Sequence, residues 1–167
     1  MVSIEKRFAT YMKFLFLLGP AATILAWLVI LYCISLNSWF DFARNAFSDL
    51  GTSRATHPEI YNVGLIVTGI MLMLYSVGLG LFSENKPEQW SSAFLFISGV
   101  FLALIGLYHG GTRPHTFVST WFFIQTDMAL FLWGLGLTST NTHWKAGILY
   151  IMLANIVDNP RHPSTLA

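Results

Sequence analysis

The sequence predicts an all-α, polytopic transmembrane helical bundle that forms a single transmembrane domain over residues 1–167. The first observation is composition: 54% of the residues are hydrophobic and 10% are charged, whereas an ordinary soluble domain has about 25% charged residues. The second is a series of long apolar runs with very few charges. The third is that none of these runs alternates with a period of two, which favours membrane-spanning helices over strands.

Four apolar runs are long enough to cross a bilayer, for which a helix needs about 20 residues. They cover approximately residues 14–36, 61–82, 91–108 and 117–137. A fifth run, 144–157, is shorter and ends before the proline-containing segment 158–163, which cannot continue a helix. We therefore predict four full spans and a short fifth helix that packs loosely. An apolar groove beside it would hold a partner helix, a second copy of the chain or detergent.

Charge, cysteine content and motifs exclude several functional classes. The formal net charge is +1, so no basic surface for nucleic acid is expected. Cys33 is the only cysteine, which rules out an intrachain disulfide and a thiolate metal cluster. The sequence has no nucleotide-binding GxGxxG or P-loop motif, and no metal, flavin or haem motif. No metal ligand is therefore assigned, and the cofactor is unknown.

The third run carries a stripe of small residues at three- and four-residue spacing: Gly99, Ala103, Gly106 and Gly110. Small side chains allow the backbone of another helix to approach closely. We therefore predict that this stripe is a helix-packing face, and we assign it no chemical role.

The lysines and arginines that flank the runs favour a cytoplasmic N-terminus in the cell membrane. In this orientation the inner side holds Lys6, Arg7, Lys13, Lys86 and Lys145, and the outer side holds Arg44, Arg54, Arg113 and Arg161. The bias is small, but the charges next to the first span usually count most. The segment 37–60 and the turn between the third and fourth runs then both lie outside.

The outer segment 37–60 has apolar residues at helical spacing. The apolar residues are Trp39, Phe40, Ala43, Phe47 and Leu50. The polar residues on the opposite side of the helix are Asp41, Arg44, Asn45 and Ser48. Ser38 can cap such a helix, and Gly51 can end it. The pattern predicts an amphipathic helix in the headgroup layer after the first span. In an alternative interpretation, the polar side of this helix closes over a pocket between the spans.

Two short motifs carry a family resemblance. The first is the run NAFSDLG at residues 45–51, an N-x-x-S-D-L-G pattern after the first span. The second extends from Gly106 to Gly111 and continues with His115 and a pair of phenylalanines, Phe122 and Phe123. Over most of residues 14–137 the chain resembles a domain-of-unknown-function family of small prokaryotic membrane proteins. The resemblance implies about six spans, one more than this sequence offers, and it implies no particular activity.

Asp127 is the most informative single residue for function. It lies about ten residues into the fourth run, near the bilayer centre at about 1.5 Å per residue. A carboxylate at that depth costs several kcal/mol unless it is paired or protonated. Four small or polar residues share its side of the helix: Thr116, Ser119, Thr120 and Gly134. Either a protonated Asp127 links two helices by a hydrogen bond, or it serves as a proton carrier, a base or a ligand-binding group.

His109, Arg113 and His115 cluster where the third run turns into the fourth, opposite Asp49 and His57 of the outer segment. Imidazole and carboxylate groups that converge from two loops could hold zinc. However, the sequence has no HxxxH or HExxH spacing. Arg113 and the neighbouring glycines suit a phosphate headgroup equally well.

These residues leave three functional classes open. We favour a bundle that binds lipid or another amphiphile, or an auxiliary subunit of a membrane complex; its partners would be membrane lipid, another subunit or a second copy. The alternatives are an intramembrane lipid hydrolase or transferase, and a proton-coupled transporter with Asp127 as the coupling site. Whether the protein is an enzyme is left open. The candidate catalytic residues are Asp127, His109 and His115, and the candidate ligand-binding residues are Asn45, Ser48, Asp49, Arg113 and Thr120.

Overall fold

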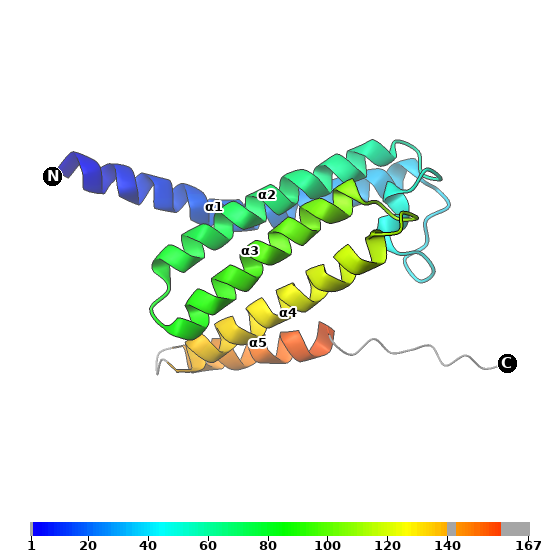
Figure 1. The fold of residues 1–167 in the computed structure, drawn as a ribbon. Helices are drawn as coiled ribbons and strands as arrows, with labels where there is room; N and C mark the ends of the chain where they lie inside the picture. Colours follow the sequence, from blue (N-terminus) through cyan, green and yellow to red (C-terminus); the bar gives the residue numbers. More distant parts are fainter. Residues whose placement is uncertain (1, 140–142, 158–167) are drawn as a thin grey trace.

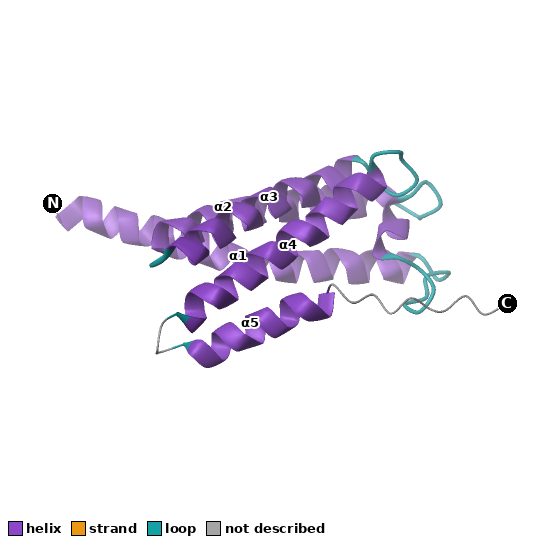
Figure 2. Ribbon diagram, turned by 60° about the horizontal axis from the view of Figure 1, so that its bottom comes forward, coloured by secondary structure: helices purple, strands orange, loops and turns teal. Residues whose placement is uncertain are grey.

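The computed structural model describes residues 2–139 and 143–157, and within them every regular element is a helix (Figures 1 and 2). The elements are α1 (Val2–Leu36), the 3₁₀-helix η1 (Phe47–Gly51), α2 (Pro58–Phe82), α3 (Lys86–Leu107), α4 (His115–Thr138) and α5 (Trp144–Val157). The all-helical prediction is confirmed for these residues, and the short fifth helix is present as α5.

Three helices are long and apolar enough to cross a membrane: α2, α3 and the part of α1 from Thr10 to Leu36. α4 has the necessary length, with 24 residues, but Gln125 and Asp127 near its middle lower its mean hydropathy. Spans are therefore supported, by length and composition, for three of the four predicted runs. For α4 a full span stays a prediction.

The helices pack in chain order, each mainly on its neighbours in the sequence. Figure 1 shows α2, α3 and α4 side by side, with α5 along α4, while the N-terminal part of α1 extends past the other helices. The segment 37–57 and the α3–α4 turn, 108–114, lie at the same end of the bundle, which we call the loop end. The α2–α3 turn, 83–85, lies at the opposite end, which we call the far end.

Glycines allow the close contact between α2 and α3, and the predicted packing face of the third run is confirmed. A Cβ atom added to Gly69 would lie 2.6 Å from the Gly99 carbonyl oxygen, and one added to Gly99 would lie 2.8 Å from that of Gly69. A Cβ atom on Gly106 would meet the carbonyl oxygen of Asn62. The two backbones can therefore touch only because these positions lack side chains.

α5 packs closely on α4 through a second glycine pair. The prediction of a loosely packed fifth helix is therefore wrong for the side of α5 that faces α4. A Cβ atom added to Gly134 would lie 2.7 Å from the Gly147 carbonyl oxygen, and one on Gly147 would lie 2.5 Å from that of Gly134. The prediction rested on the length of the helix, whereas close packing depends on small residues at the contact. The segment 158–163 lies outside the described residues.

The predicted amphipathic helix after the first span does not form. Residues 37–46 make turns, and only Phe47–Gly51 is helical, as η1. Asp41 Oδ1 accepts a hydrogen bond from the Ala43 N–H at 2.8 Å, and Asn45 Oδ1 accepts one from the Asp41 N–H at 2.9 Å. Such bonds between short polar side chains and nearby backbone groups compete with helix formation. In this segment these hydrogen bonds favour turns, although the helical spacing of the apolar residues predicted a helix.

Asn37 ties this segment to the bundle and is only 2% exposed. Its amide donates to the carbonyl oxygens of Cys33 (2.8 Å) and Thr56 (3.4 Å). Its Oδ1 accepts from the Thr56 N–H (2.7 Å) and from the Trp39 indole N–H (3.0 Å). Leu50 of η1 is fully buried in the hydrophobic core. The segment 37–57 therefore covers the loop end of the bundle.

Candidate functional site

A cavity of about 660 Å³ lies at the loop end, between α1, α2, α3, α4 and the segment 37–57. We call it the loop-end cavity. Its volume is within the range of about 300–1,000 Å³ that is typical of small-molecule sites. Its apolar lining residues are Ala26, Ile30, Phe42, Ala46, Phe47, Leu65, Leu102, Ile105, Phe122 and Phe123.

The polar lining residues of the loop-end cavity are Asn45, Ser48, Tyr61, Thr68, His115 and Ser119. None of the described residues that line it is Asp, Glu, Lys or Arg. Three of the predicted site residues, Asn45, Ser48 and His115, therefore meet at one cavity, although they come from segments far apart in the sequence.

His115, the first residue of α4, has a fixed ring orientation. Its Nδ1 lies 2.8 Å from the Tyr108 carbonyl oxygen, and because a carbonyl can only accept, Nδ1 carries the proton and donates. In the neutral ring Nε2 is then an acceptor. Ser119 lies one turn later on the same face, and its hydroxyl donates to the Thr116 carbonyl oxygen at 3.1 Å rather than to His115.

Tyr61 is a cavity residue that the sequence pattern alone did not single out. It is 5% exposed, and within the described residues its hydroxyl forms no hydrogen bond. A polar group of a cavity-lining residue that has no partner in the protein is available to a ligand. The signal that could have found it is spacing: Tyr61, Leu65 and Thr68 share one face of α2, and all three line the cavity.

The other candidate residues of the two loops do not line the cavity. Asp49 caps η1, because its Oδ2 accepts a hydrogen bond from the Ala46 N–H at 3.0 Å. Arg113 and Thr120 are exposed. His109 lies in the α3–α4 turn, where its Nδ1 is 3.0 Å from the Gly110 carbonyl oxygen.

Asp127 lies in a different part of α4 and is 7% exposed. It precedes Gly134 by two helical turns, so it shares the face of α4 that packs on α5. Asp127 and His115 are 12 residues apart, which is about 18 Å along a helix that rises about 1.5 Å per residue. The structure therefore does not bring Asp127 together with the two histidines.

Two more cavities follow along the bundle toward the far end. The central cavity, about 520 Å³, is lined by residues of all five α-helices, and the far-end cavity is about 440 Å³. The two share Leu79 and Trp133 as lining residues, so they adjoin each other. α5 contributes Tyr150 to the central cavity. Space therefore remains between α1 and the α4–α5 pair: α5 lines the central cavity, and none of its described residues lines the far-end cavity.

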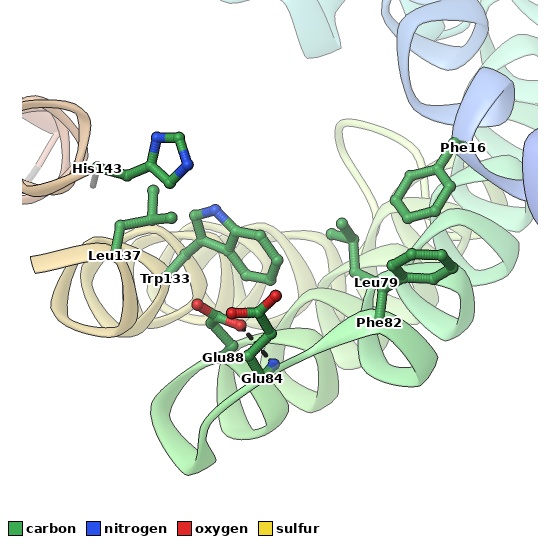
Figure 3. A pocket seen from close by; sticks show the side chains of 8 residues that line it. All are labelled: Phe16, Leu79, Phe82, Glu84, Glu88, Trp133, Leu137 and His143. Carbon is green, nitrogen blue, oxygen red and sulfur yellow. Dashed lines mark hydrogen bonds between the residues drawn. The ribbon is translucent and has the colours of Figure 1, made fainter. Parts of the chain in front are cut away.

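The far-end cavity, unlike the loop-end cavity, contains carboxylates. Figure 3 shows Glu84 and Glu88 next to each other, with Trp133 between them and His143. Glu88 is 6% exposed, and its carboxylate accepts hydrogen bonds from the Glu84 N–H and the Asn85 amide, both at 2.8 Å. Asn85 is the N-cap of α3. These bonds give Glu88 a structural role in capping α3.

The candidate zinc ligands of the two loops do not form a metal site. Among the described residues, no three His, Cys, Asp or Glu side chains lie close enough to hold one metal ion. His57 instead lies 2.9 Å from the Glu59 carboxylate, and both side chains are exposed.

Comparisons with known proteins give a family but no characterised relative. No curated protein and no solved structure matches the chain. The model of a family described as a protein of unknown function, DUF998, matches residues 20–157. This range includes α2 to α5 and the C-terminal half of α1. The predicted resemblance to a family of unknown function is confirmed at this level, and the chain belongs to the DUF998 family.

Proposed function

We propose that this chain is an integral membrane protein that binds a membrane amphiphile in the loop-end cavity. The observation that carries the proposal is how polarity is distributed in that cavity. Four helices supply most of the apolar walls, and the segment 37–57 adds Phe42, Ala46 and Phe47. Most of the polar groups come from this segment or from the first two turns of α2 and α4: Asn45, Ser48, Tyr61, His115 and Ser119. An amphiphile has the same division between a hydrocarbon chain and a polar headgroup. Ligand sites typically combine apolar walls with a few polar groups that fix the orientation of the ligand.

The outer surfaces of the long helices support a membrane location. Large apolar side chains are exposed there, among them Leu17, Ile24, Leu28, Val63 and Leu107. In water this surface would be unfavourable, because soluble proteins rarely expose contiguous apolar patches of such extent. In a bilayer the same side chains face lipid, while each helix satisfies its own backbone hydrogen bonds.

A binding role fits the geometry better than hydrolysis or transfer does. A lipid hydrolase built on Asp127 and a histidine needs these groups within hydrogen-bond reach, about 2.6–3.2 Å. Asp127 instead lies about 18 Å along α4 from His115. Ser119 donates to a backbone carbonyl and not to the His115 ring. The same separation gives a transporter based on Asp127 no link to the loop-end cavity.

We also propose that the protein lies in the cell membrane with its N-terminus in the cytoplasm. The support is the distribution of lysines and arginines, with Lys6, Arg7 and Lys13 before the apolar part of α1. In this orientation the loop-end cavity lies in the outer half of the bilayer.

Photolabelling tests the binding proposal. The purified protein is irradiated with lipids that carry a diazirine in the acyl chain, and the crosslinked peptides are mapped by mass spectrometry. We expect crosslinks at residues of the loop-end cavity. Ala26→Phe fills the cavity from α1, and we expect it to reduce this labelling about tenfold, equivalent to about 1.4 kcal/mol.

The matched control is Ile24→Phe. Ile24 lies on the same helix but is 61% exposed, so this variant should label like the unaltered protein. Thermal unfolding of both variants checks that they are folded. Unchanged labelling of folded Ala26→Phe, or crosslinks confined to the outer faces of the helices, would refute binding at this cavity.

A further inference from the structure

The loop-end cavity is built without charge, although three arginines lie at the same end of the molecule. Arg44 lies 3.8 Å from the Asp41 carboxylate, and the Arg54 guanidinium stacks over the Trp39 ring, 4.7 Å from its centre. Arg113 is exposed. None of the three lines the cavity. The nearest cations are therefore engaged with other groups or directed to solvent.

An uncharged cavity selects against charged headgroups. A phosphate or carboxylate that entered it would lose its hydration and would gain no lysine or arginine in return. A quaternary or primary amine would gain no carboxylate. Among the described lining residues His115 carries the one imidazole, and its Nδ1–H is already donated to the Tyr108 carbonyl. Charge complementarity thus points to a neutral ligand.

The polar groups of the cavity match a hydroxyl. The Tyr61 hydroxyl, which forms no hydrogen bond to the described residues, can both donate and accept. With Nδ1–H donated to the Tyr108 carbonyl, the uncharged form of the His115 ring offers Nε2 as an acceptor. Ser48 adds another hydroxyl, and Asn45 adds an amide whose Oδ1 is already used in the turn. A headgroup with hydroxyls would satisfy these groups, whereas a plain hydrocarbon would leave them unpaired.

We infer that the ligand of the loop-end cavity is a lipid with an uncharged, hydroxyl-bearing headgroup, of the class of monoacylglycerols and long-chain alcohols. The headgroup lies at Tyr61 and His115, and the chain lies between the apolar walls of α1, α2, α3 and α4. This inference rests on the proposed function, because it names the chemistry of the amphiphile that the same cavity binds.

Three diazirine lipids with one acyl chain length test the inference: a monoacylglycerol, a free fatty acid and a lysophosphatidylglycerol. Each competes for labelling of the cavity in the full chain. We expect the monoacylglycerol to label at least about tenfold more strongly than the two anionic lipids. A single hydrogen bond to the headgroup is enough to change the affinity by about tenfold. Preferred labelling by an anionic lipid would overturn the uncharged headgroup and leave amphiphile binding intact. If no lipid labels the cavity, the proposed function fails as well.

Tyr61→Phe gives the residue-level test, since it removes one oxygen and no hydrogen bond within the described protein. Monoacylglycerol labelling should fall about three- to tenfold, while the weak fatty-acid labelling should stay the same. Tyr32→Phe is the control, because Tyr32 is 54% exposed on α1. An equal loss of labelling for all three lipids would show that the Tyr61 hydroxyl does not recognise the headgroup, and would overturn the inference.

Ser119→Lys supplies a gain-of-function test. Ser119 lines the cavity one turn after His115, so a lysine there would add the cation that the cavity lacks. We expect the preference to shift toward the fatty acid. A folded variant that still prefers the monoacylglycerol to the same degree would show that cavity charge does not govern selection.

Discussion

The loop end and the far end of the bundle belong to the same helices, yet each closes its cavity in a different way. At the loop end the segment 37–57 covers the helices, held by the buried Asn37 and by Leu50 in the core. At the far end α5 packs on α4 through Gly134 and Gly147, and cavities remain between that pair and α1. The loop-end cavity is uncharged, whereas Glu84 and Glu88 line the far-end cavity.

This difference shows that polar side chains and small residues have different structural roles in this bundle. Four hydrogen bonds of Asn37 order a long connection that has little helix of its own. Glycines bring helices into contact but leave any gap beside the contact unfilled. A selective site is therefore expected where a connection has been ordered over the helices, at the loop end.

The largest effect is expected for Asn37→Leu. The side chain is deeply buried, and its loss leaves the Thr56 N–H and the Cys33 carbonyl without their partner. At about 0.5–1.5 kcal/mol for each hydrogen bond, the free energy of unfolding should fall by roughly 3 kcal/mol. Thermal unfolding measures this change, and limited proteolysis should cut within residues 37–57. The control is Ser38→Ala at the exposed neighbouring position. Equal stability of the two variants would contradict the role of Asn37.

A smaller effect is expected for Gly134→Leu at the far end. Even the Cβ atom would lie 2.7 Å from the Gly147 carbonyl oxygen, so α5 must move away from α4, at a cost of about 1–3 kcal/mol. Spin labels on α4 and α5 should report a longer distance between the helices, while lipid labelling at the loop end should be unchanged. Leu135→Phe, at a neighbouring residue with 37% exposure, serves as the control. Loss of labelling in Gly134→Leu alone would show that the two ends are coupled.

The smallest effect on the structure is expected for single cysteine substitutions, which test whether the two ends lie on opposite sides of the membrane. In a Cys33→Ser background, Arg113→Cys marks the loop end and Lys86→Cys marks the far end, and both positions are exposed. A membrane-impermeant thiol reagent applied to intact cells should label position 113 and leave position 86 unlabelled. The reverse pattern would invert the proposed orientation. Labelling of both positions after the cells are opened shows that each thiol is reactive.

Local properties of the sequence determined the helices of this protein. Composition and the length of the apolar runs predicted a helical, membrane-type chain, and the runs at 61–82 and 144–157 correspond to α2 and α5. The small-residue stripe predicted the face of α3 that meets α2. Such features are readable because a helix in lipid satisfies its own backbone hydrogen bonds, so its bounds depend on neighbouring residues alone.

Only the tertiary structure decided what the connections do and which polar groups meet. The helical spacing in residues 38–50 predicted a helix, but Asp41 and Asn45 turned the chain and Asn37 fixed it to Thr56. Asp127 lies on the side of α4 that also carries Gly134, where α5 packs, while Tyr61 lines a cavity with residues from α4 and the segment 37–57. These placements depend on contacts between residues distant in the chain. Periodicity reports which side of a helix a residue occupies, and the packing of the other helices decides what that side faces.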